Sequence, residues 1–184
     1  MNQKTPRLRI FAGPNGSGKS TIKEVISEEL LGIYINPDEI EKHINNYGFI
    51  DFNSFGFSTN KEEIWEFLKK STLLKTVGLE KEILKLKYSG DKLIFDDIKI
   101  NSYFASVCAD FIRKKLLEIR KSFTFETVMS SYDKIELLKL MTDKSSGTLY
   151  PKSVASCIIR TANKSSIITR AVACVSFKTS AKFG

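Results

Sequence analysis

The segment from Gly13 to Ser20 reads Gly-Pro-Asn-Gly-Ser-Gly-Lys-Ser and fits the pattern G-x-x-x-x-G-K-[ST] at every fixed position. Glycines allow the conformations in which successive backbone N–H groups turn toward an anion, and the start of a helix adds positive potential. Lys19 would supply a cation to the terminal phosphates, and Ser20 would offer its hydroxyl to Mg²⁺. The pattern predicts binding of ATP with Mg²⁺ by consecutive residues: Gly13, Pro14, Asn15, Gly16, Ser17, Gly18, Lys19, Ser20 and Thr21.

Two carboxylates follow short β-prone runs, where they could serve a phosphoryl transfer, which needs a carboxylate near the acceptor hydroxyl. Asp38 closes the turn Ile35-Asn36-Pro37-Asp38, so its side chain could face the phosphate loop across the edge of a sheet. Local sequence leaves helix N-capping open as its alternative role. Glu126, with Thr127 beside it, follows the run at residues 122–125 and could instead be an ordinary helix-start carboxylate.

The third acidic candidate is a pair, Asp96 and Asp97, which follows the short apolar run at residues 92–95. This arrangement is similar to the acidic end of a strand that helps to hold a metal ion in P-loop ATPases. The alternative for this pair is a solvated turn.

The elements expected around these residues alternate between strand and helix. The apolar run at residues 8–12 stops at Gly13, and apolar residues at helical spacing follow over residues 20–31. Gly32 is expected to end that helix, before a second strand at residues 33–35 and a third at residues 122–125. The alternation predicts an α/β fold of P-loop NTPase or kinase type, with a parallel sheet flanked by helices. The expected buried face of the first helix is Ile22, Val25, Ile26 and Leu30.

Between the second and third strands, the sequence predicts a helical insertion at residues 48–100 within a core of residues 1–141. Residues 47–58 are rich in glycine and aromatic residues and indicate a loop, and helices are expected at residues 60–70, 73–87 and 102–120. The expected apolar positions of these three helices are Ile64, Phe67 and Leu68, then Leu79, Ile83, Leu84 and Leu86, then Val107, Phe111, Leu116 and Ile119.

Composition changes after Met141. Residues 142–184 hold 13 Ser or Thr, seven Lys or Arg and one acidic residue, so most of the net charge of +8 lies in this tail. A basic tail allows a nucleic-acid-binding module as an alternative function, but few aromatic residues are interleaved with its charges, which weighs against it. The tail contains enough β-branched residues at 154–159 and 167–177 to form strands.

Composition also bounds the class of protein. The three cysteines form no CxxC pair and, with the single histidine, His43, offer no set of zinc ligands. No apolar run approaches the length of a membrane-spanning helix, and no signal-peptide pattern opens the chain, so we expect a cytoplasmic protein without a membrane partner.

The glycine loop, the Asn36-Pro37-Asp38 turn and the segment Phe123-Thr124-Phe125-Glu126-Thr127-Val128-Met129-Ser130 together resemble the zeta-toxin family of P-loop kinases, over residues 5 to about 140. The resemblance implies an ATP-dependent kinase that phosphorylates a hydroxyl of a small molecule such as UDP-N-acetylglucosamine, in a toxin–antitoxin system with an antitoxin protein as a partner. It also implies that Lys19 holds the phosphates, Ser20 the magnesium, Asp38 acts as the base, and Glu126 with Thr127 lines the acceptor site.

The sequence departs from that family after Lys139. The family's arginine helix and glycine–histidine lid have no counterpart, and Arg160 and Arg170 are the downstream arginines. We therefore hypothesise a frameshifted or otherwise altered C-terminus that leaves ATP binding intact but impairs transfer, because arginine contacts to the moving phosphate are worth factors of about 10³ to 10⁵. A P-loop ATPase that uses Asp96 or Asp97 and acts on a partner protein is the alternative enzyme.

Overall fold

The computed structural model describes residues 6–12, 19–96, 98, 100–127, 155–159 and 171–176. The chain divides into two compact units: residues 1–34 with 121–184, and residues 35–120. The second unit is thus one continuous segment inserted into the first.

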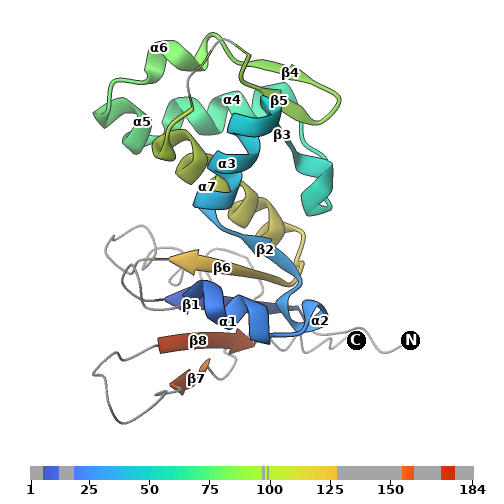
Figure 1. Cartoon of the computed structure of the whole chain (residues 1–184). Coiled ribbons are helices and arrows are strands. Elements are labelled where there is room, and N and C mark those ends of the chain that lie inside the picture. The colour runs from blue at the N-terminus through green and yellow to red at the C-terminus, as the bar shows by residue number, and fades with distance from the viewer. Residues whose placement is uncertain are drawn as a thin grey trace, which may run out of the picture. The chain divides into compact units, whose positions relative to one another are not determined.

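The first unit is built on a five-stranded sheet in the order β2-β6-β1-β8-β7 (Figure 1). Strands β1 (Arg7–Ala12), β2 (Ile33–Ile35) and β6 (Phe123–Thr127) form its three-stranded parallel part. Strand β6 pairs with β1 from Leu8 opposite Phe123 to Ala12 opposite Thr127. These strands confirm the three predicted runs, and the structure is a mixed α/β fold with parallel strands flanked by helices.

Two strands from the tail complete this sheet, and both of their pairings are antiparallel rather than parallel. Strand β8 (Ala171–Ser176) is antiparallel to β1, and β7 (Ala155–Ile159) is antiparallel to β8. Their positions confirm the β-forming capacity predicted for residues 154–159 and 167–177. The prediction of an entirely parallel sheet is wrong at this edge, where antiparallel pairing needs no helical crossover between neighbouring strands.

The helix expected over residues 20–31 is two short helices, α1 (Lys19–Val25) and α2 (Glu28–Leu31). Ser27 separates them because its backbone is extended (φ −60°, ψ 144°) and it precedes the acidic first turn of α2. The predicted apolar face is wrong at two positions, since Val25 is 78% exposed and Leu30 is 47% exposed. Gly32 ends α2 as expected, with a positive φ of 61° and a close approach to the Ser122 carbonyl.

The second unit combines helices with its own antiparallel sheet, in the order β3-β5-β4. The strands are β3 (Phe49–Asp51), β4 (Lys87–Ser89) and β5 (Lys92–Ile94), and a 3₁₀ turn, η1 (Phe52–Phe55), follows β3. The helices are α3 (Pro37–Tyr47), α4 (Lys61–Lys70), α5 (Thr72–Thr76), α6 (Glu80–Ile83) and α7 (Ser102–Glu118).

Aromatic residues join the helices of this unit to η1. Phe111 of α7 contacts Phe52, Phe57 and Phe67, with ring centroids 5.4, 6.3 and 5.2 Å away. Phe111 is 2% exposed and Phe52 is fully buried, so these rings form part of the core of the unit.

Helix α4 confirms the prediction for residues 60–70, whereas the helix expected over residues 73–87 is broken. Gly78, with a φ of 72°, separates α5 from α6, and the chain is already in β4 at Lys87. Leu84 is 74% exposed rather than part of an apolar face, and Ile119 lies at the C-cap of α7, 44% exposed. A periodic apolar pattern does not register a positive-φ glycine or a helix end.

A hydrogen-bonded junction at Asp91 connects the turn between β4 and β5 to the loop before α4. The Asp91 carboxylate accepts hydrogen bonds from the Thr59 backbone N–H at 2.9 Å and the Tyr88 hydroxyl at 3.1 Å. Asp91 has a positive φ of 60°, a conformation that Asp and Asn tolerate better than most residues. None of the described helices is both long and apolar enough to cross a membrane.

Candidate functional site

The candidate site begins at the carboxyl end of β1. Ala12 is the last residue of this interior strand, and Lys19 is the first residue of α1, so the glycine-rich segment connects the two elements. Lys19 is half-buried and Thr21 is exposed. Residues 13–18 and the side chain of Ser20 lie outside the described part, so the loop conformation predicted from the sequence stays a prediction.

The Glu126 side chain is hydrogen-bonded to a tyrosine of the neighbouring strand β2. The Tyr34 hydroxyl, from β2, donates a hydrogen bond to the Glu126 carboxylate. Phe11, opposite Glu126 in β1, lies against the Tyr34 ring with centroids 6.4 Å apart. On the same ring, the Lys23 ammonium of α1 lies 4.2 Å from the centroid, within cation–π range. The predicted carboxylate therefore belongs to a cluster that joins β1, β2, β6 and α1.

Thr127 ends β6 directly beside the start of the glycine-rich segment, because it is paired in register with Ala12. Its side chain is buried, and the Thr127 hydroxyl makes no hydrogen bond within the described residues. An unpaired buried hydroxyl costs roughly 1–3 kcal/mol, so a ligand that pairs it would recover that free energy. Glu126 and Thr127 leave the strand on opposite faces, so both can contact one ligand only at the strand end.

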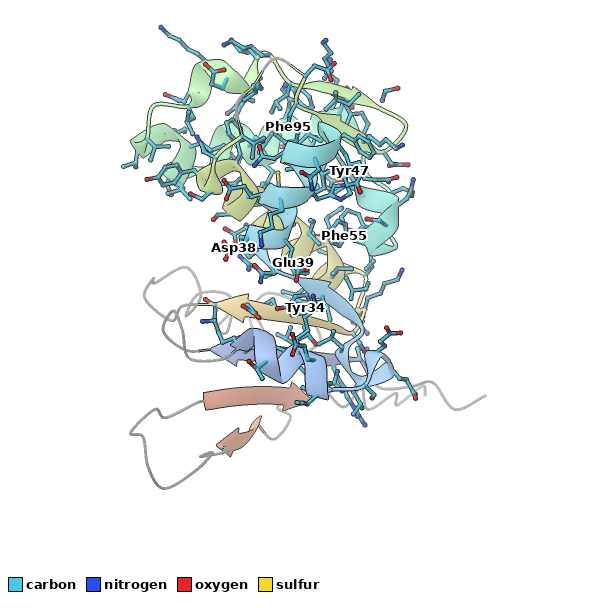
Figure 2. All side chains as sticks on the ribbon, in the orientation of Figure 1. Tyr34, Asp38, Glu39, Tyr47, Phe55 and Phe95 are labelled. Carbon is cyan, nitrogen blue, oxygen red and sulfur yellow. The ribbon has the colours of Figure 1, made fainter. Side chains whose placement is uncertain are left out.

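Asp38 is not the N-cap of its helix. The cap of α3 is Asn36, whose side-chain oxygen accepts a hydrogen bond from the Asp38 backbone N–H at 2.8 Å. Pro37 takes the first helical position, where its missing N–H has no cost. The Asp38 carboxylate is exposed in the first turn of α3 (Figure 2) and makes no hydrogen bond or ion pair with any described residue. The structure thus removes the capping alternative and leaves this carboxylate available for other roles.

The candidate residues are divided between the two units. The first unit contains Lys19, Glu126 and Thr127, together with the helix and strand that carry them. The second unit contains Asp38. Asp38 is connected to the first unit through the chain, because it comes three residues after the end of β2.

The structure does not support the alternative role of Asp96 and Asp97 as metal-holding residues of a P-loop ATPase. The strand before it, β5, belongs to the sheet of the second unit and not to the sheet that contains β1. The Asp96 carboxylate is exposed and pairs with the Lys87 ammonium at 3.2 Å, as expected for a solvated turn. Asp97 lies outside the described residues, as do Arg160 and Arg170.

Tyr34 is the member of the cluster that sequence reasoning missed. It lies in the apolar run of β2, where a tyrosine reads as an ordinary β-forming residue. Its proximity to Glu126, 92 positions away in the chain, comes from the pairing of β2 with β6. The sequence signal that could have identified Tyr34 is its position, one residue before the end of a strand-like run that leads into the Asn36-Pro37 turn.

Within the described ranges, no three side chains of His, Cys, Asp or Glu gather as a metal-binding group. Comparisons with protein-family models, with curated proteins and with solved structures gave no match.

Proposed function

We propose that this protein is an ATP-dependent kinase of the P-loop type that transfers the γ-phosphate of ATP to a hydroxyl of a small molecule. The observation that carries the proposal is the pairing of Ala12 with Thr127. It places the buried Thr127 hydroxyl, which has no hydrogen-bond partner among the described residues, and the Glu126 carboxylate on the strand next to the one that leads into the glycine-rich segment. Ligands of α/β proteins bind at the carboxyl ends of parallel strands. This preference favours a binding site at the carboxyl ends of β1 and β6.

The roles proposed for the residues follow from their chemistry. Lys19 neutralises the terminal phosphates, and the hydroxyl of Ser20 contributes to holding Mg²⁺, an ion that takes most of its other ligands from phosphate oxygens and water. Asp38 accepts the proton of the acceptor hydroxyl while the hydroxyl oxygen bonds to phosphorus and the bond to the ADP oxygen breaks. Glu126 and Thr127 hold the acceptor, for which UDP-N-acetylglucosamine is the candidate suggested by the resemblance to zeta toxins.

The experiment that tests the nucleotide part is calorimetry of Mg·ATP binding to the full chain and to Lys19→Ala. A charged hydrogen bond to phosphate contributes roughly 1.5–3 kcal/mol, so the variant should bind at least about 10-fold more weakly. Lys75→Ala, which removes an exposed lysine of the second unit, is the matched control and should bind as the unmodified chain does. Equal affinities of Lys19→Ala and the unmodified chain would contradict the proposal.

A further inference from the structure

The Tyr34 side chain is constrained at both its hydroxyl and its ring. The hydroxyl donates to one oxygen of Glu126, Oε1. The ring neighbours Phe11 of β1, and the Lys23 ammonium of α1 lies over it. Both β1 and α1 flank the glycine-rich segment, so the elements that carry the proposed phosphate site also fix the orientation of this phenol.

The hydrogen bond distinguishes the two oxygens of Glu126. A tyrosine hydroxyl that donates to an ionised carboxylate occupies one oxygen and restrains rotation of the carboxylate group. Among the described residues, Glu126 makes no other hydrogen bond, and its side chain is half-buried. The second oxygen is an acceptor only, and it suits a ligand that presents an O–H or N–H donor.

We propose that Tyr34 is a positioning residue that orients Glu126 so that one carboxylate oxygen receives a hydroxyl or N–H group of the acceptor substrate. This inference rests on the proposed kinase function and deepens it, because it assigns the acceptor a hydrogen-bond donor at this point. An acceptor with an anionic group in that place is rejected, since it would meet an oriented carboxylate.

Tyr34→Phe is a sharp test because it removes the hydroxyl and keeps the ring for Phe11 and Lys23. The measurement is calorimetric affinity for UDP-N-acetylglucosamine, with Mg²⁺ and a non-hydrolysable ATP analogue present, for four proteins: the unmodified chain, Tyr34→Phe, Glu126→Gln and the double variant. Tyr34→Phe should bind the probe on the order of 10-fold more weakly, as expected for a hydrogen bond to a charged group. The double variant should match Glu126→Gln, because Tyr34 acts through Glu126.

Tyr88→Phe is the matched control. It removes another tyrosine hydroxyl, which lies 3.1 Å from the Asp91 carboxylate and 2.6 Å from the Thr59 backbone carbonyl, its two acceptors in the second unit. It should lower stability toward urea at least as much as Tyr34→Phe and leave probe affinity unchanged, which separates positioning from a merely structural effect.

The inference would be overturned if Tyr34→Phe bound the probe as tightly as the unmodified chain while Glu126→Gln bound it weakly. It would also be overturned if the two single effects multiplied in the double variant. An unmodified chain that binds the ATP analogue but not the probe would also overturn it, together with the acceptor assignment. Failure of the whole proposed function is distinguishable, because Mg·ATP affinity would then not depend on Lys19.

Discussion

At the scale of single residues, Thr127 and Asp38 each hold a polar group without a protein partner in the described structure, one buried and one exposed. Unpaired groups of this kind are costly or neutral for stability and useful for binding. Replacing either group should therefore change function much more than it lowers stability, which allows a structural role to be separated from a functional one.

Replacing Thr127 with valine should stabilise the protein and weaken its ligand binding. Valine has nearly the shape of threonine and removes the unpaired hydroxyl, so the free energy of unfolding should rise by about 1 kcal/mol. Urea unfolding measures this change, and calorimetry with Mg·ATP and UDP-N-acetylglucosamine measures binding. A variant that loses stability would show that the hydroxyl is paired in solution, and one with unchanged affinity for both ligands would exclude it from the site.

Asp38→Asn and Asn36→Ala should separate catalysis from capping. Because Asn36 is the cap, Asn36→Ala should lower stability by roughly 1 kcal/mol. Asp38→Asn removes only a charge in the first helical turn, which costs about 0.3–1 kcal/mol, but it should abolish phosphoryl transfer while ATP affinity stays nearly intact. Transfer measured with radiolabelled ATP decides the question, and an active Asp38→Asn protein would eliminate Asp38 as the base. If the unmodified chain is inactive, a chain with a restored arginine-bearing C-terminus serves instead.

At the scale of elements, the hydrogen-bonded junction at Asp91 makes the stability of the second unit depend on pH. The hydrogen bond from the Thr59 backbone N–H, supported by the Tyr88 hydroxyl and Asn53, lowers the pKa of Asp91 below its ordinary value of 3.8. Burial, and then the neighbouring Asp91, raise the pKa of Tyr88 to about 12, so its hydroxyl remains a donor over the whole physiological range.

A carboxylate whose folded-state pKa is lowered stabilises the fold above its unfolded-state pKa, and this contribution is lost as pH falls through the folded-state value. Urea unfolding midpoints of the full chain should therefore fall as pH decreases below about 4. Asp91→Asn should flatten part of this decrease, since asparagine tolerates the positive φ but does not titrate. If the unfolding midpoint of the variant fell equally steeply with pH, the loss of stability would come from other carboxylates.

At the scale of the whole molecule, the two units differ in how the chain builds them. The second is one segment, residues 35–120, with its own sheet, helices and aromatic core. The first is assembled from both ends of the chain, and its central strand β1 has β6 on one side and the tail strand β8 on the other. Two strands of the tail that the sequence marks as atypical, β7 and β8, thus belong to the same sheet as the candidate site.

We expect residues 35–120 to fold in isolation, because they are one continuous segment with its own sheet and aromatic core. The fragment should give a single cooperative urea transition and slowly exchanging amides in α7. Phe111→Ala in the same fragment should cost about 3–5 kcal/mol, as expected for deletion of a large buried ring. A fragment without a cooperative transition would show that the unit requires the first sheet.

The sequence by itself determined local features: the strands at residues 8–12, 33–35 and 122–125, the end of a helix at Gly32 and the helix predicted at residues 60–70. Each is specified by residues within a few positions of one another, through alternation, helical spacing or the backbone freedom of glycine. It also placed Glu126 and Thr127 at a strand end, where the structure has them.

The tertiary structure decided which strands meet. The insertion of β6 between β1 and β2, the antiparallel approach of β8 and the hydrogen bond from Tyr34 to Glu126 join positions far apart in the chain. The break between α1 and α2 and the capping role of Asn36 also became clear only there. The strand pairings could not be read from the sequence because they depend on the balance of burial and chain entropy over the whole sheet, which no local pattern contains.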